Sequence, residues 1–210
     1  VVDWLEFRIQ VPEVLPERMT KIARIVQEKL DLRFKKITRR SIWKEKIGQK
    51  FFDLINETYS QLYGYSILSQ RQIDQYVKTY LQIIDLRMVS FIVDGNDEIV
   101  AAGVTMPSMS KALQKCNGKL FPLGWWYMVK NMFIKKDDTL DLLLIAIKPE
   151  YQNKGVNAML FADLFPRLKD MGFKAAESNA ELESNVKVQS QWQGLEWEQH
   201  KRRRIYGKSI

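Results

Sequence analysis

The stretch IAIKPEYQNKGVNAMLF (Ile145–Phe161) decides the fold, because it runs from an apolar strand through a polar turn directly into a helix. The first N–H groups of a helix have no partner within it, and the helix dipole adds partial positive charge at the same point. Gly155 lets the backbone approach an anion closely, and Lys154 adds formal charge. The stretch therefore predicts a site for phosphate oxygens. An ordinary strand–helix turn, with Gly155 present for geometry alone, is the equal alternative from these residues.

Composition sets bounds on the class of protein. The chain has 210 residues, of which 46% are hydrophobic, enough for one large domain with a sizeable core. The single cysteine, Cys116, excludes an internal disulfide framework, and together with the single histidine, His200, it argues against a zinc site. The longest apolar run, Leu142–Ile147, is too short to span a bilayer. Since the chain begins at Val1 without a signal segment, we interpret it as trimmed or processed and expect a cytoplasmic protein.

The net charge of +8 favours anionic partners, which include nucleic acid, a membrane surface and a phosphorylated cofactor. Part of this charge lies in the run Lys201–Arg204. In a strand, Lys201 and Arg203 would share one face, and Arg202 and Arg204 the other. Charge on both faces favours an edge strand, a homodimer rim or a contact with a cofactor phosphate. We expect no nucleic-acid partner, since no base-stacking motif accompanies the run.

The hydrophobic pattern predicts alternating strands and helices. Strands are expected at Leu5–Val11, Leu32–Ile37, Thr139–Lys148, Ala175–Ser184 and His200–Ile210, and a hairpin at Met88–Met106. Helices are expected at Pro16–Leu30, Ser41–Leu62, Arg71–Ile84, Ser108–Cys116, Gly155–Met171 and Val186–Trp197. This order predicts an α/β (α+β) domain of three layers, with a mixed twisted sheet and helices on both faces.

The opening stretch resembles the acyl-CoA-binding motif of the GCN5-related N-acetyltransferase (GNAT) superfamily. In that motif a strand ends in Pro-Glu-Tyr, and Gln or Arg then begins a turn into a helix, as in residues 149–156 here. The resemblance covers roughly residues 32–210 and implies acetyl-CoA or another acyl-CoA as co-substrate. It implies that amides around Asn153–Ala158 hold the coenzyme A pyrophosphate and that the strand edge pairs with the pantetheine arm. The implied binding residues are Ile145, Ala146, Ile147, Gln152, Asn153, Lys154, Gly155, Val156, Asn157, Ala158 and Asn185.

Three positions depart from the motif. Asn153 and Asn157 stand where the family usually has glycine, although asparagine tolerates left-handed backbone angles. The family's Asn followed seven residues later by Tyr appears here as Asn185 and Trp192, so the tyrosine that often protonates the leaving thiolate is missing. Asn185 could equally bind pantetheine or simply cap the next helix.

The segments ESNAELESN and KRRRIYGKSI resemble a largely uncharacterised bacterial GNAT subgroup, some members of which acylate long-chain amines. The resemblance implies a GNAT-like domain at residues 32–210. Residues 1–31 would then be a strand–helix extension or the remnant of a preceding domain. The acceptor is expected to be a small-molecule or lipid-like primary amine, without an integral membrane segment.

Transfer of an acyl group to an amine requires a base, since an alkyl amine of pKa about 10 is mostly protonated at neutral pH. Candidates on the expected strands are Asp141, Glu177, Glu181 and Glu183. Glu183 is favoured, Glu181 shares its face of the strand, and Tyr206 could replace the missing acid. Solvent-facing or structural carboxylates are the alternative.

Two further interpretations remain open at this point. The aromatic segment Gly118–Phe133, with Trp125 and Trp126, could line an apolar acceptor pocket or belong to the core. The whole chain could also be a non-catalytic module that keeps the fold and acts by binding, which the residues Asn153, Asn157 and Trp192 favour.

Overall fold

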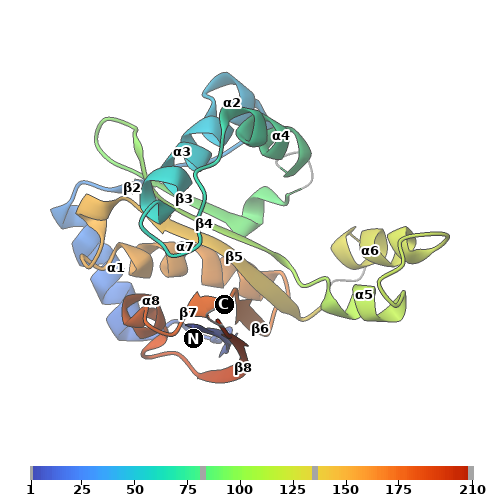
Figure 1. Ribbon diagram of the computed structural model, residues 1–210. Helices are drawn as coiled ribbons and strands as arrows, with labels where there is room; N and C mark the ends of the chain where they lie inside the picture. The colour runs from blue at the N-terminus through green and yellow to red at the C-terminus, as the bar shows by residue number, and fades with distance from the viewer. Residues whose placement is uncertain (1, 81–83, 134–136, 208–210) are drawn as a thin grey trace. The chain divides into compact units, whose positions relative to one another are not determined.

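Figure 1 shows the computed structural model, which describes residues 2–80, 84–133 and 137–207. The chain divides into two compact units, and three elements continue from one unit into the other. These elements are β4 (Ile99–Pro107), β5 (Thr139–Ile147) and α7 (Val156–Asp170). The first unit comprises residues 1–13, 105–143 and 168–210, and the second comprises residues 14–104 and 144–167.

The second unit contains two further strands and most of the helices. Its strands are β2 (Arg33–Phe34) and β3 (Val89–Val93). Its helices are α1 (Glu17–Lys29), α2 (Arg39–Lys44), α3 (Ile47–Tyr59), α4 (Gln70–Tyr80) and the short 3₁₀ helices η1 (Leu86–Met88) and η2 (Pro149–Tyr151).

The first unit contains four strands and three short helices of its own, with one 3₁₀ turn. Its strands are β1 (Val2–Gln10), β6 (Ala175–Ser178), β7 (Glu181–Leu182) and β8 (Trp197–Ile205). Its helices are α5 (Ser110–Lys115), α6 (Gly124–Phe133) and α8 (Val186–Gln189), followed by η3 (Ser190–Trp192).

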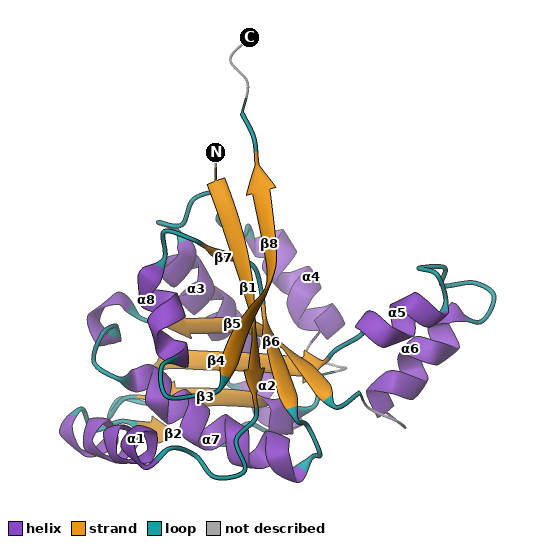
Figure 2. Cartoon of the chain, turned by 90° about the horizontal axis from the view of Figure 1, so that it is seen from below, coloured by secondary structure: helices purple, strands orange, loops and turns teal. Residues whose placement is uncertain are grey.

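The strands form a mixed sheet in the order β2-β3-β4-β5-β6-β1-β7, and β8 pairs with β1 (Figure 2). β5 and β6 run parallel, with Leu142 opposite Ser178, whereas β3 and β4 form an antiparallel hairpin. Asp94 holds the hairpin turn, because its Oδ1 accepts from the N–H groups of Asn96 and Glu98 at 2.9 and 3.0 Å. The predicted mixed sheet and hairpin are confirmed.

Strand β1 is the most connected strand of the first unit, although the sequence placed it in an N-terminal extension. It pairs antiparallel with β6, β7 and β8. Its inward side chains Leu5, Phe7 and Ile9 are 5%, 3% and 0% exposed. Residues 2–10 therefore contribute directly to the core of this unit.

The helix predicted at Ser41–Leu62 is wrong as a single element. The structure has α2 and α3 instead, separated at Lys46, whose φ of 52° is left-handed and cannot continue a right-handed helix. The single helix was predicted because the apolar side chains of both helices follow one helical spacing that continues across this break. Thr38 starts α2 with a capping box to Ser41.

Other predicted elements are shorter in the structure. The strand predicted at Ala175–Ser184 is two strands, β6 and β7, and the strand at Leu32–Ile37 is reduced to two residues. The helix predicted at Val186–Trp197 is one turn of α8 followed by η3, and Trp197 already begins β8. Residues 81–83 of the predicted helix Arg71–Ile84, and 208–210 of the last predicted strand, lie outside the described residues.

Replacing Ile9 by alanine tests whether β1 belongs to the core. Because the side chain is fully buried, Ile9→Ala should lower the free energy of unfolding by about 2–4 kcal/mol in a denaturant titration. Ile67→Ala, at a side chain that is 69% exposed, should change it by less than about 0.5 kcal/mol. Equal effects of the two substitutions would contradict the placement of β1.

Candidate active site

The turn between β5 and α7 has an unusual backbone. After β5 ends at Ile147, η2 and a four-residue turn lead into α7 at Val156. Asn153 and Gly155 both adopt left-handed backbone angles, with φ of 58° and 84°. Asparagine tolerates such angles better than most residues, in agreement with the expectation for Asn153 from the sequence.

Gly155 is required by packing as well as by its backbone angle. A Cβ at this position would lie 2.8 Å from Cγ2 of Ile22 and 3.2 Å from Cγ2 of Val26, both on α1. The turn is therefore pressed against α1 within the second unit. Any other residue would strain the backbone and push against the buried face of that helix.

Five successive N–H groups of the turn are left without a protein acceptor in the part of the chain that the structure describes. They belong to residues 153–157, whereas the N–H groups of Gln152 and Ala158 are bonded to Pro149 and Gly155. Together with the dipole of the 15-residue helix α7, they form a cluster of donors with positive potential. The exposed Lys154, whose Nζ lies 5.9 Å from the centre of the Tyr151 ring, adds charge beside it.

Side chains of the protein occupy carbonyls at the end of β5. Tyr59 on α3 donates its hydroxyl to the carbonyl of Ile145 at 2.9 Å. Gln152 donates its side-chain amide to the carbonyl of Ile147 at 3.0 Å. Gln152 thus turns back to the strand, and the edge predicted to pair with pantetheine has two of its acceptors already engaged. Ala146, between them, is fully buried.

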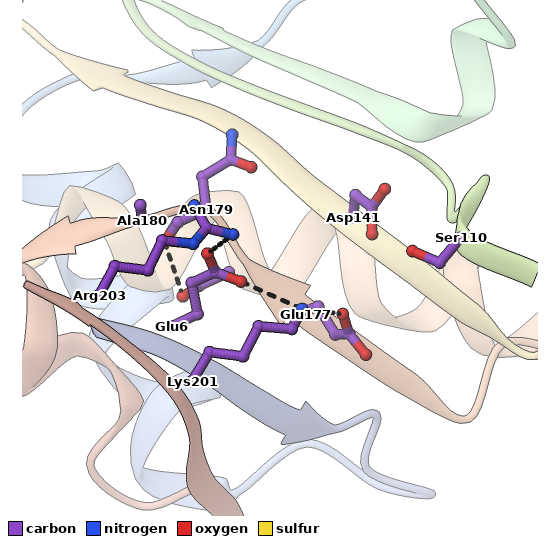
Figure 3. A pocket seen from close by; sticks show the side chains of 9 residues that line it. Glu6, Ser110, Asp141, Glu177, Asn179, Ala180, Lys201 and Arg203 are labelled. Atoms are coloured by element: carbon purple, nitrogen blue, oxygen red, sulfur yellow. Dashed lines mark hydrogen bonds and ion pairs between the residues drawn. The ribbon is translucent and has the colours of Figure 1, made fainter. Parts of the chain in front are cut away.

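A pocket of about 400 Å³ lies in the first unit (Figure 3). It is lined by one apolar residue, Ala180, and by charged and polar residues of several elements, namely Glu6, Ser110, Asp141, Glu177, Ser178, Asn179, Lys201 and Arg203. Lys201 lies 3.1 Å from Glu6 and 3.4 Å from Glu177, and Arg203 also pairs with Glu6. The pocket therefore combines three carboxylates with two cations, and Glu6 is a member that the sequence did not indicate.

Asp141 and Glu177 are a pair of carboxylates on neighbouring strands. They lie directly opposite each other in the parallel register of β5 and β6, so both side chains face the pocket. Burial raises the pKa of Asp141 above its usual range, and the negative charge of Glu177 adds to this rise. A carboxylate with a raised pKa binds a proton more readily, as a general base for an amine requires.

Glu181 is the most perturbed acid of the predicted candidates. Burial raises its pKa to about 7, while the side chains of Ser178 and Trp192 oppose that rise by hydrogen bonding. Its Oε2 is buried without a partner in the described structure. Trp192, at the position of the family's tyrosine, is 1% exposed and belongs to the core beside Glu181.

Glu183 and Tyr206 lie outside the pocket lining. Glu183 is paired with Arg202 at 2.7 Å, and Tyr206 is 75% exposed. Asn185 caps α8, since its Oδ1 accepts from the N–H of Val188 at 3.4 Å. This agrees with the capping interpretation of Asn185.

The basic strand β8 is largely neutralised within its own unit. Arg202 and Arg204 bond to Asp3, each at 2.7 Å, and these guanidinium groups hold the pKa of Asp3, led by Arg204, well below its usual range. Lys201 and Arg203 pair instead with Glu6. The predicted alternation of the two faces is confirmed, and within the described residues β8 pairs only with β1, as an edge strand would.

The predicted aromatic pocket wall at Trp125–Tyr127 does not line the pocket, nor is it core. The three side chains are 47%, 46% and 40% exposed. No described helix is long and apolar enough to cross a membrane.

The raised pKa of Glu181 predicts a pH dependence of stability. With its pKa raised to about 7, Glu181 keeps a proton in the folded state up to that pH, whereas in the unfolded chain it loses the proton near the ordinary pKa of 4.5, so stability falls as pH rises between these values. Glu181→Gln should remove this fall and raise the free energy of unfolding at pH 8 by about 1–3 kcal/mol. At pH 4 the two proteins should be equally stable. A substitution that destabilises equally at both pH values would contradict the assignment.

Comparison with known proteins supports the same fold. No family model matches the chain. The sequence is 25% identical over 169 residues to a bacterial ceramide synthase of Caulobacter vibrioides, which covers 77% of this chain and 43% of that protein. It is 27% identical over 111 residues to protein YghO of Escherichia coli, covering 51% of this chain and 28% of that one. The chain thus spans less than half the length of these curated relatives.

Among solved structures, a GCN5-related N-acetyltransferase from Sphaerobacter thermophilus matches with a TM-score of 0.56 at 9% identity. The match covers 96% of this chain and 50% of that one. The predicted α/β architecture is thereby confirmed, and the chain has the fold of the GCN5-related N-acetyltransferases.

Proposed function

We propose that this chain is an acyl-CoA-dependent N-acyltransferase that moves an acyl group to a primary amine. The observation that carries the proposal is the row of five unbonded N–H groups at residues 153–157, at the start of α7. Such a cluster suits the diphosphate of coenzyme A. The fold, and the name of the Caulobacter relative, support acyl transfer as the use of this site.

The residues of the turn have distinct roles in this proposal. The amides of residues 153–157 donate to the diphosphate, and Gly155 keeps the backbone close enough for them to converge. Lys154 contributes charge at the edge of the site. Because Tyr59 and Gln152 occupy the carbonyls of Ile145 and Ile147, the pantetheine arm competes with them for these acceptors.

Asp141 is the proposed base, with Glu177 beside it. Coenzyme A supplies the acyl group as an activated thioester. Asp141 takes the proton that the amine loses as its nitrogen bonds to the acyl carbon, and the C–S bond then breaks. The leaving thiolate takes a proton from solvent in this proposal, since Trp192 stands in place of the family's tyrosine. Glu181, Glu183 and Tyr206 remain predictions of the sequence, and the pocket lining favours Asp141 over them.

A long-chain amine is the proposed acceptor. The Caulobacter relative is named a ceramide synthase, and a ceramide is the amide of a long-chain amino alcohol. Asp141, for which no ion pair is found among the described residues, suits the cationic head of such a molecule, whereas Glu6 and Glu177 are already paired with Lys201 and Arg203. This acceptor agrees with the resemblance of the C-terminal segments to a subgroup that acylates long-chain amines.

A non-catalytic binding module is the second candidate function. Trp192 in place of the tyrosine and the engaged carbonyls of β5 favour it. The N-acyltransferase and the binding module would both bind coenzyme A at this site, and only the N-acyltransferase would transfer an acyl group to an amine.

Removal of one amide tests the coenzyme site without changing any charge. Val156 is the first residue of α7, where proline is tolerated but has no N–H to donate. Val156→Pro should weaken coenzyme A binding in calorimetry roughly tenfold or more, because a hydrogen bond to a charged group contributes about 1.5–3 kcal/mol. Val186→Pro places proline at the first residue of another helix, α8, and should bind normally, and circular dichroism checks that Val156→Pro, at a buried side chain, stays folded. Equal affinities would contradict the site.

Thiol release tests turnover. With a long-chain acyl-CoA and a long-chain amino alcohol, the chain should release coenzyme A faster than with a short amine. Asp141→Asn should lower kcat by roughly a hundredfold or more while coenzyme A affinity is kept. Asp74→Asn, at an exposed residue of α4, is the control. Tight coenzyme binding without turnover on any amine would favour the binding module.

A further inference from the structure

The helices α5 and α6 form a hairpin with an unusually apolar surface. They belong to the same unit, lie side by side in Figures 1 and 2, and are joined by residues 116–123. Phe121 and Leu123 in the connection are 80% and 63% exposed. The large apolar side chains exposed on the hairpin are Leu113, Leu120, Phe121, Leu123, Trp125, Trp126, Tyr127 and Val129.

These eight side chains fall within 17 residues, so they form a concentrated surface and are not scattered over the molecule. In α6, Trp125, Trp126 and Tyr127 are consecutive, and therefore point to different sides of the helix. None of the described side chains of α6 is buried, and the one buried residue among them is Gly124, which has no side chain. Patches of this kind on soluble proteins mark sites of interaction with a protein or a membrane.

The charge of the hairpin is of one sign. Residues 108–133 contain four lysines and no aspartate or glutamate. Lys111 is paired with Asp137 at 2.6 Å, whereas the exposed Lys115, Lys119 and Lys130 have no ion pair within the described residues. The apolar surface is thus accompanied by three uncompensated positive charges.

The connection between the helices is held in a fixed arrangement. Trp125 donates its indole N–H to the carbonyl of Pro122 at 3.0 Å and its main-chain N–H to Leu120 at 2.9 Å. A Cβ on Gly124 would lie 1.8 Å from the carbonyl oxygen of Lys119, so only glycine allows this close approach. Leu120, Phe121 and Leu123 are therefore presented outward by an ordered backbone.

We propose that the α5–α6 hairpin docks the protein on a lipid bilayer with anionic headgroups. Tryptophan and tyrosine prefer the boundary between headgroups and acyl chains, where phenylalanine and leucine can enter the apolar layer. Lysines next to the apolar surface are attracted to anionic lipid. The hairpin meets both requirements, and the inference stands on this surface independently of the proposed reaction.

A second copy of the chain is a poorer occupant of the same surface. In a symmetric dimer the patch would face its own copy, which brings Lys115, Lys119 and Lys130 of both chains together without acidic partners. The charge pattern therefore selects anionic lipid over self-association.

Vesicle flotation tests the proposal with the 210-residue chain and no acyl-CoA or amine, so its result does not depend on catalysis. The chain should bind vesicles that contain phosphatidylglycerol, bind phosphatidylcholine vesicles far less, and be released by salt. Phe121→Ser with Trp126→Ser should weaken binding about tenfold or more. The matched control is Trp43→Ser with Tyr63→Ser, at side chains that are 54% and 68% exposed, and it should bind the vesicles as the unaltered chain does.

Reversal of charge provides the second arm. Lys115→Glu, Lys119→Glu and Lys130→Glu together should weaken binding on the order of a hundredfold. Lys21→Glu, Lys29→Glu and Lys78→Glu change the net charge equally on other helices and should have a smaller effect. Folding of all variants is checked by circular dichroism.

Three outcomes would overturn the proposal. They are no binding of the unaltered chain to anionic vesicles, equal binding by the hairpin and control variants, and self-association in sedimentation that is lost on replacing Phe121 and Trp126. The last outcome would assign the surface to a second copy.

Discussion

The unbonded main-chain donors at the start of α7 are the feature on which the proposed function depends. They exist because Asn153 and Gly155 take left-handed backbone angles, which turn successive N–H groups outward instead of into a ladder. Only glycine fits at position 155, because Ile22 and Val26 leave no room there for a Cβ. The backbone of the proposed anion site is therefore shaped by packing between α1 and the turn, in addition to the residues of the turn itself.

Much of this site could be predicted from the sequence, because a strand that feeds a helix through a glycine turn has few possible backbones. The donors, the left-handed asparagine and the apolar strand all follow from local residues. The contributions of Tyr59 and Gln152 could not, since a hydrogen bond between α3 and the end of β5 joins residues 86 apart in sequence. The same holds for Glu6, which enters the pocket only because β1 pairs with β6 and β8.

Elements were predicted well from the sequence where a long hydrophobic pattern or a specific turn residue determines the local structure. They were predicted poorly where contacts between distant residues determine it. The apolar pattern of β5 and the turn chemistry at Asp94 each specify one structure. The pattern across Lys46 does not, because a left-handed residue between two amphipathic helices leaves their apolar spacing almost unchanged. Residues 2–10 were predicted to form a strand of an N-terminal extension, because no feature of their own sequence indicates that three other strands pair with them. Trp192 likewise gives no local sign that it packs beside a buried carboxylate.

The positive charge of the chain has at least two different uses. On β8 the charge is paired within the same unit, since Lys201, Arg202, Arg203 and Arg204 form ion pairs with the four carboxylates Asp3, Glu6, Glu177 and Glu183. On the α5–α6 hairpin the lysines stay uncompensated beside an apolar surface. A net charge of +8 therefore says little by itself, and the distribution of partners decides which cations are available to a ligand.

Amide NMR of the ¹⁵N-labelled chain during addition of coenzyme A tests the central claim most directly, since it observes the proposed donors themselves. We predict that the amide signals of residues 153–157 move the most, and that pantetheine, which lacks the diphosphate, leaves them nearly unchanged. Coenzyme A that leaves these five signals in place, or moves only signals elsewhere in the chain, would contradict this prediction.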